Sequence, residues 1–146
     1  MTAKEIAAWL RQVAQRLPEE VRAAEAASGR ELLQACIENS SGLASPADLR
    51  RQGHPYARRH GTPRLDPDVV NRQSGAFVHA WRLDGPRSAE GGLVTAVFNT
   101  DPKAAAFLES GTRLMFARGP HRKALRETAP RRSIRLKAAI QRAFHP

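Results

Sequence analysis

The apolar positions at the beginning of the chain repeat with the spacing of a helix. Between residues 3 and 17 they recur every three or four positions, at Ile6, Leu10, Val13 and Leu17. This spacing is typical of an amphipathic helix that buries one face. Pro18 is predicted to end this helix and to begin a second one that runs to Asn39, because proline suits the first turn of a helix. Residues 1–42 are therefore predicted to form N-terminal helices.

Two further helices are predicted at the other end of the chain, on either side of Pro130. The first covers residues 120–128, and the second covers residues 131–144. The second has an apolar stripe on one face, formed by Leu136, Ala139, Ile140, Ala143 and Phe144. The pattern predicts a terminal helix that docks through this apolar stripe. Its basic side chains then lie on or beside the polar face, at Arg131, Arg132, Arg135 and Lys137.

The central part of the chain has the pattern of β-strands. Residues 74–83 alternate and place Phe77, His79, Trp81 and Leu83 on one side, which predicts a half-buried strand. Residues 93–98 predict a second, antiparallel strand, and residues 84–92 between them are predicted to be a mobile loop, too long for a tight hairpin. Two strands do not make an independent sheet. We therefore expect further strands at 56–60, 68–73 or 113–118, or completion of the sheet by a neighbouring subunit.

A short helix over residues 103–109 is predicted after the second strand. Asp101 is suited to cap it, and Pro102 fits its first turn. Gly111 is predicted to end the helix in a left-handed conformation. The three large apolar residues that follow, Leu114, Met115 and Phe116, are expected at a subunit contact, as is the 84–92 loop.

These elements predict a single α+β domain over residues 1–146, in which a small antiparallel sheet packs against the N-terminal and C-terminal helices. Residues 43–73 form a linker or loop segment, and residues 74–146 contain the sheet and the C-terminal helices. His54 and His60 lie in the linker, but no further ligand type follows at a metal-binding spacing. We expect a structured loop there, with no metal and no cofactor. No run of 18 apolar residues occurs, so no membrane span is expected.

The net charge of +10 is concentrated at the C-terminal end of the chain. The last 36 residues contain ten Lys and Arg side chains and one Glu. Such a block favours a polyanion or an acidic partner surface, although a solvated helix face has the same composition. A small basic nucleic-acid-binding protein is therefore the alternative function, although no turn and recognition helix are apparent. An enzyme is not expected, because the sequence has no phosphate-binding loop, nucleophile elbow, HExxH motif or paired carboxylates.

The segment Phe107-Leu108-Glu109-Ser110-Gly111-Thr112, followed by Ala117-Arg118 and Pro120, resembles a motif of the tail-completion and head–tail joining (neck) proteins of tailed bacteriophages. The upstream Ser74-Gly75-Ala76-Phe77 resembles the element that opens the sheet in that family. The resemblance covers residues 70–146. The sequence departs from the family pattern at Ala104, where tyrosine is commoner, and at Gly119, which is inserted before Pro120.

The resemblance implies a structural virion protein and not an enzyme: a subunit of a ring, with six copies expected, at the neck or top of the tail. A tail-terminator-like role is preferred. The partners implied are other copies of the chain, neighbouring neck and tail proteins and, loosely, the passing genome, in a virion assembled in the host cytoplasm. The implied subunit-interface residues are Phe107, Glu109, Gly111, Thr112, Leu114, Met115 and Phe116. The residues expected to face DNA, the lumen or a partner are Arg131, Arg132, Arg135 and Lys137.

Overall fold

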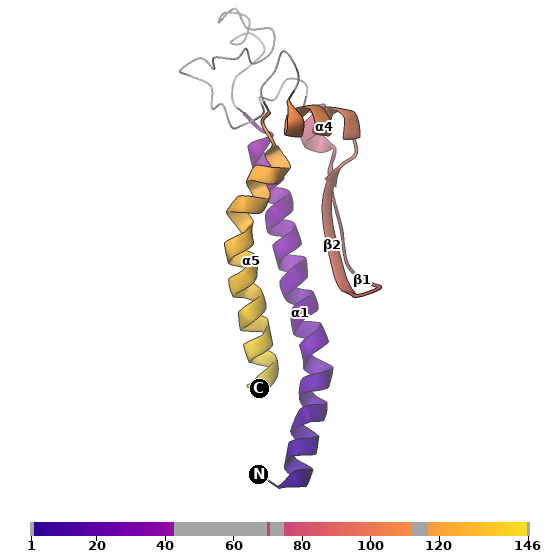
Figure 1. Ribbon diagram of the computed structural model, residues 1–146, viewed down its shortest axis with the longest axis vertical. Helices are drawn as coiled ribbons and strands as arrows, with labels where there is room; N and C mark the ends of the chain where they lie inside the picture. The colour runs from indigo at the N-terminus through magenta and orange to yellow at the C-terminus, as the bar shows by residue number, and fades with distance from the viewer. Residues whose placement is uncertain (1, 43–69, 71–74, 112–116, 146) are drawn as a thin grey trace, which may run out of the picture.

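The computed structural model describes residues 2–42, 70, 75–111 and 117–145, and it has an α+β fold. In chain order the elements are α1 (Ala3–Asn39), α3 (Ala76–His79), β1 (Trp81–Ala89), β2 (Gly92–Asn99), α4 (Pro102–Ser110) and α5 (Pro120–Phe144). The two long helices α1 and α5 run antiparallel, side by side, and the hairpin of β1 and β2 lies along another side of α1 (Figure 1). α4 lies near the end of α1 that is remote from both chain termini.

Both long helices continue through a proline that was predicted to interrupt them. Pro18 lies inside α1 and Pro130 lies inside α5, so the predicted breaks are wrong. Each proline is exposed, and buried residues precede and follow it in its helix, such as Val13 and Ala24 around Pro18. Tertiary packing on both sides therefore outweighs the loss of one backbone hydrogen bond.

α5 packs against α1 through small side chains. Ala124, Ala139 and Ala143 are almost completely buried, and α1 contributes Ala24, Ser28 and Ala35 to the buried set. Ala139 and Ala143 of the predicted stripe are buried, as expected, whereas Ile140 is 45% exposed and Phe144 is 36% exposed, so the predicted stripe is wrong in part. Alanines occupy the positions closest to α1 because their size lets the helix axes approach, and the larger residues lie at the margin.

The sheet is a tight two-stranded hairpin. β1 pairs antiparallel with β2 from Trp81 opposite Asn99 to Ala89 opposite Gly92, as the sequence predicted for the orientation. The prediction of a long loop over 84–92 is wrong, because only two residues connect the strands. Gly91 and Gly92 have φ values of 91° and 140°, which permit this tight turn.

The predicted beginning of the first strand is also wrong. Residues 76–79 form the short helix α3, which follows Gly75 at a φ of 82°. The hairpin begins at Trp81, whose side chain is buried, while Leu83 is half-buried on the same face. His79, which the alternation placed on the apolar face, is exposed. Alternation alone therefore placed Trp81 and Leu83 correctly but extended the strand too far.

A glycine in α1 allows the hairpin to approach the helix. A Cβ atom at Gly29 would lie 2.6 Å from Thr95 Cγ2 and 2.8 Å from Leu83 Cδ1. Both distances are shorter than ordinary contacts between carbon atoms. The helix propensity lost at Gly29, about 1 kcal/mol relative to alanine, therefore accompanies a close contact between helix and sheet.

Trp81 joins the three main parts of the fold. Its ring is 6% exposed and packs with Ala35, Cys36, Val97 and Ala124. Its Nε1–H donates to Ser40 Oγ at 3.0 Å, so the polar atom is satisfied inside the core. Its ring also stacks on the His121 imidazole with centroids 6.1 Å apart. One side chain from β1 thus contacts both α1 and α5.

Cys36 is a free, fully buried thiol. Burial raises its pKa to about 12, and the nearby Glu109 carboxylate contributes in the same direction. The thiol therefore stays protonated at physiological pH and does not act as a nucleophile.

Several predictions concern residues outside those described. They are the linker at 43–73 (Val70 excepted) with His54 and His60, most of the further strands proposed at 56–60, 68–73 and 113–118, and the interface residues Thr112, Leu114, Met115 and Phe116. Within the described ranges, the sheet contains β1 and β2 only.

Candidate assembly site

The two halves of the phage-like motif meet where α4 is joined to α5. The Arg118 backbone N–H donates to the Leu108 carbonyl at 2.7 Å, which ties the second half of the motif to α4. Pro120, the first residue of α5, is fully buried. We call this arrangement of Leu108, Glu109, Gly111, Arg118 and Pro120 the α4–α5 joint.

Glu109 caps α5 from a different helix. Its Oε1 accepts hydrogen bonds from the backbone N–H groups of His121 at 2.8 Å and of Arg122 at 3.4 Å. A carboxylate is favoured there, because the first N–H groups of a helix have no partner within it and carry partial positive charge. The Arg122 guanidinium adds an ion pair at 3.9 Å. Glu109 therefore holds α4 and α5 together within one subunit.

Gly119 provides the space for this cap. A Cβ atom at Gly119 would collide with the Glu109 carboxylate. Gly119 also has no side chain with which to cap α5 itself. The inserted glycine, one of the two departures from the family pattern, is thus explained by the position of Glu109.

Gly111 ends α4, as the sequence predicted, but in a different conformation from the one expected. Its φ is 75° and its ψ is 179°, and its N–H donates to the Phe107 carbonyl at 2.8 Å. The positive φ was expected, whereas the ψ lies outside the left-handed helical region. Only glycine commonly occupies this combination of angles.

We predict that Gly111→Val lowers the free energy of unfolding by about 1–3 kcal/mol, because a β-branched residue is strained at these angles. Chemical denaturation of the purified variant measures the change. Ser110→Ala is the matched control, since Ser110 is exposed at the neighbouring position in α4. A Gly111→Val variant as stable as the control would refute the conformation assigned to Gly111.

The structure describes three of the seven proposed interface residues. Glu109 and Gly111 belong to the α4–α5 joint, where their contacts lie within the subunit. Phe107 is different, because it is 56% exposed on α4. Among the proposed interface residues in the described ranges, Phe107 is therefore the one available to a second molecule.

The arginines expected to face DNA, the lumen or a partner lie against α1. Arg132 pairs with Glu25 at 2.7 Å, and the Glu25 side chain is only 9% exposed. Glu31 accepts from both Arg131 at 2.6 Å and Arg135 at 2.8 Å. Lys137, the fourth residue in the set, is exposed.

These pairs correct the expectation that the polar face of α5 is directed away from the rest of the subunit. Arg131 and Arg132 remain more than half exposed, but their charges are opposed by carboxylates of α1. The sequence contained a usable signal, since Glu20, Glu25 and Glu31 are spaced along α1 and the arginines are spaced along α5. Which faces of the two helices meet was not evident from either pattern alone.

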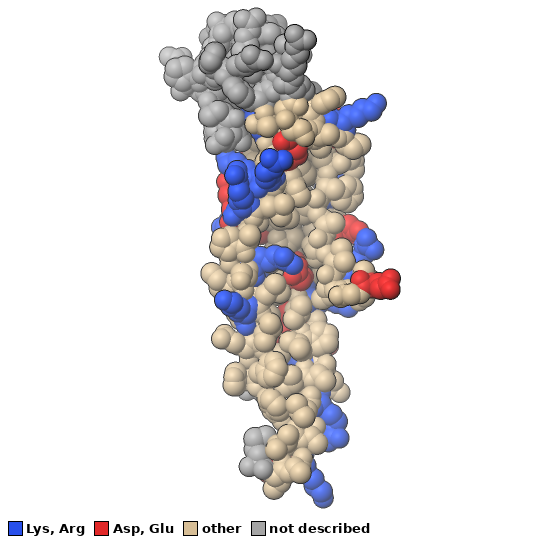
Figure 2. All heavy atoms as spheres, in the orientation of Figure 1, with Lys and Arg blue, Asp and Glu red and all other residues tan. Residues whose placement is uncertain are grey.

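Basic groups do not form one continuous surface on the face shown in Figure 2. Blue groups appear there in separate clusters, several of them beside red groups. The described residues Lys123, Arg126 and Lys137 lie on α5, and none of them has a carboxylate within ion-pair distance in the described structure. These three residues are better placed than the paired arginines to contact a polyanion.

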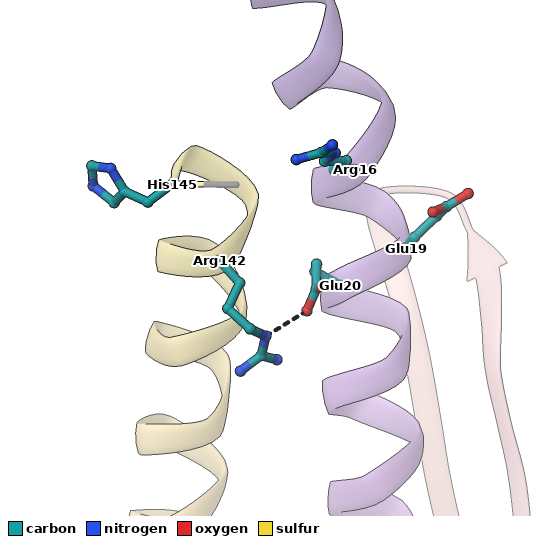
Figure 3. A pocket seen from close by; sticks show the side chains of 5 residues that line it. All are labelled: Arg16, Glu19, Glu20, Arg142 and His145. Carbon is teal, nitrogen blue, oxygen red and sulfur yellow. Dashed lines mark hydrogen bonds and ion pairs between the residues drawn. The ribbon is translucent and has the colours of Figure 1, made fainter. Parts of the chain in front are cut away.

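A shallow groove of about 450 Å³ lies between α1 and the end of α5 (Figure 3). It is lined by Arg16, Glu19, Glu20, Arg142 and His145. Arg142 pairs with Glu20 at 2.8 Å, while the side chains of His145 and Glu19 point away from this pair. The polar groups of the groove therefore do not converge on one point, as binding or reaction of a small molecule would require.

Nine large apolar side chains are exposed among the described residues. Six of them form three pairs, each four residues apart on one element: Ile6 and Leu10 on α1, Val94 and Phe98 on β2, and Ile140 and Phe144 on α5. Residues four apart lie on the same face of a helix, and also on the same face of a strand. Each pair is a small apolar surface that another molecule could cover.

The described residues contain neither a metal-binding cluster nor a membrane-spanning helix. No group of three or more His, Cys, Asp or Glu side chains there is arranged to hold a metal ion. None of the helices in these ranges has both the length and the apolar character required to cross a membrane.

Comparison of the chain with protein-family models, with curated proteins and with solved structures gives no match.

Proposed function

We propose that the chain is a structural virion protein of a tailed phage or prophage, a ring-forming neck or tail-completion component that joins head and tail. The α4–α5 joint is the observation that carries this proposal. The motif that resembles the phage family is divided between two segments, and residues of both segments meet in that joint. The resemblance therefore corresponds to a structural unit of this chain and not to scattered positions.

The chemistry of the joint supports an architectural role. Glu109 and Gly111 act on backbone groups, at the first turn of α5 and the last turn of α4 respectively. Neither residue belongs to a group of three or more possible metal ligands in the described structure. Phe107 is exposed on the surface of α4, where it suits a contact with another copy of the chain.

The three exposed apolar pairs support self-association. Two pairs lie toward the ends of α1 and α5 where Trp9 packs on Phe144, and the third lies on β2, so more than one element carries surface that is costly to leave in water. A ring requires two different surfaces on each copy, because a head-to-tail contact joins unlike patches. A ring of six copies, the number that the resemblance implies, is the assembly we propose.

The ion pairs of α5 weigh against a dedicated nucleic-acid-binding protein. Arg131, Arg132 and Arg135 are held by Glu25 and Glu31, so they are not free to make a full set of phosphate contacts. Arg126 and Lys137 are exposed and Lys123 is half-buried, and these three cations suit loose contact with the passing genome.

Deletion of the coding gene from the phage or prophage tests this function. We expect DNA-filled heads and separate tails in the lysate, because the component that joins them is absent. Supply of the wild-type chain or of Ser110→Ala from a plasmid should restore tailed virions. Normal numbers of tailed, infectious virions after deletion would contradict the proposal.

A further inference from the structure

The two strands of the hairpin present different edges. β1 contains an irregularity between Asp84 and Arg87, where Gly85 and Pro86 interrupt the regular pairing with β2. Pro86 has no N–H to donate, and the exposed residues of β1 include Arg82, Asp84 and Arg87. Bulges, prolines and charges are the features with which proteins prevent an edge strand from pairing with another chain.

β2 has none of these protective features. Residues 91–100 contain no charged side chain and no proline, although the whole chain carries a net charge of +10. Val94 is 38% exposed and Phe98 is 45% exposed on the outer face, with Ala96 between them. A regular, uncharged edge strand of eight residues is a template for pairing with another strand.

We propose that β2 pairs antiparallel with β2 of a second copy of this chain, which joins the two hairpins into a four-stranded sheet. The second copy is the occupant because its β2 is uncharged and regular, whereas its β1 is interrupted and charged. Neither copy brings a like charge into the new strand pair, despite the strongly basic chain. The sheet also gains strands, since two are marginal on their own.

The side chains of β2 suit one register. Strand pairing about a two-fold axis at Ala96 places Ala96 opposite its own copy, and Val94 opposite Phe98 of the second copy. On the outer face of each strand, the small side chain of Ala96 then lies between the larger Val94 and Phe98. The two Ala96 side chains meet at the two-fold axis. In this register every residue from Leu93 to Asn99 has a partner.

This contact is distinct from the contacts that close a ring. A two-fold contact uses the same surface on both copies and is complete with two, whereas a ring of six copies uses two different surfaces. The inference therefore does not depend on the proposed role in a virion.

Cross-linking of the purified full-length chain tests the register. In antiparallel pairs, the Cα atoms of directly opposed residues are about 4.5–5.5 Å apart, which is within disulfide range. Ala96→Cys should therefore form a covalent dimer under mild oxidation. Ala89→Cys is the matched control on β1 and should remain monomeric on a denaturing gel. Cys36 does not interfere, because it is fully buried.

Light scattering tests the contact without a cross-link. We expect the wild-type protein to have twice the mass of Ala96→Lys, whether Ala96→Lys has the mass of one 16.1 kDa chain or of a ring of such chains. Within each copy, a lysine at position 96 lies opposite Asp84 and so does not disturb the hairpin. Across the axis the two lysines repel each other. Ala89→Lys carries the same change on β1 and should remain dimeric.

Three outcomes would overturn the inference: a monomeric wild-type protein, a dimeric Ala96→Lys variant with native circular dichroism, or equal cross-linking at positions 96 and 89. Failure of the proposed function is distinguishable from these. A wild-type ring that Ala96→Lys leaves unchanged would support the ring and reject the β2 contact. A dimer that depends on Ala96, together with normal virions after gene deletion, would support the contact and reject the virion role.

Discussion

Trp81→Ala is expected to lower the free energy of unfolding by about 3–5 kcal/mol, the range for removal of a large aromatic side chain from a core. The side chain is 6% exposed and contacts residues of α1, β2 and α5. Its loss leaves a cavity and removes the hydrogen bond to Ser40 Oγ. Urea denaturation followed by circular dichroism measures the change.

Trp9→Ala provides the matched control for this substitution. Trp9 is half-buried near the free end of α1, where its ring packs on Phe144 with centroids 5.9 Å apart. Because fewer elements surround it, we expect a loss of about 1–2 kcal/mol from the smaller apolar area uncovered. Equal losses for the two tryptophans would show that Trp81 does not hold the hairpin and the two helices together.

Joint replacement of Arg131, Arg132 and Arg135 by glutamine is expected to destabilise the subunit by about 2–4 kcal/mol. The buried Glu25 carboxylate loses the two hydrogen bonds that the Arg132 guanidinium donates to it. Glu31 loses its ion pairs with both Arg131 and Arg135. Arg131 and Arg132 are more than half exposed, so water screens their charges and makes the loss of stability smaller than for fully buried pairs. Urea denaturation at two salt concentrations measures it.

The same change at Lys123, Arg126 and Lys137 is the control. It removes the same number of positive charges from α5, but these residues have no ion pair in the described structure. We expect a change within about 1 kcal/mol, since surface substitutions away from specific contacts have small effects. Similar losses in the two triple variants would mean that the pairs with α1 contribute nothing.

Binding of duplex DNA by the wild-type chain should be weak, insensitive to sequence and steeply dependent on salt. The variant that lacks Lys123, Arg126 and Lys137 should lose more DNA binding than the variant that lacks the three arginines. The reason is that these three cations have no ion pair in the described structure and are available to phosphate. A titration against random and specific duplexes measures both properties. Sequence-selective binding tighter than about 10⁻⁸ M at physiological salt, the range of dedicated regulators, would favour the nucleic-acid-binding alternative.

Local signals in the sequence were sufficient for much of the fold. Asp101 caps α4 by accepting from the Ala104 N–H at 3.0 Å, and Gly111 ends the same helix at a positive φ. Trp81 lies on the buried side of β1, and β1 pairs antiparallel with β2, as their patterns predicted. Each of these features depends on a few consecutive residues, so no knowledge of distant parts of the chain was needed.

Features that depend on distant parts of the chain were missed. Pro18 and Pro130 remain inside helices because α1 and α5 support each other over most of their length. Arg132 faces Glu25, 107 residues away in sequence, and no local pattern indicates that these faces meet. The cap that Glu109 provides to α5 was missed for the same reason. The motif identified Glu109, but no local pattern indicated that its carboxylate accepts from the first turn of α5.

The central claim, a subunit at the junction of head and tail, is tested most directly by location in the virion. Antibodies raised against the purified chain and coupled to gold can be imaged by electron microscopy on virions of the phage that encodes it. We predict gold particles at the neck or the adjacent top of the tail, and none along the head or at the distal tail tip. Virions that contain no detectable chain, or that carry the label elsewhere, would contradict the account.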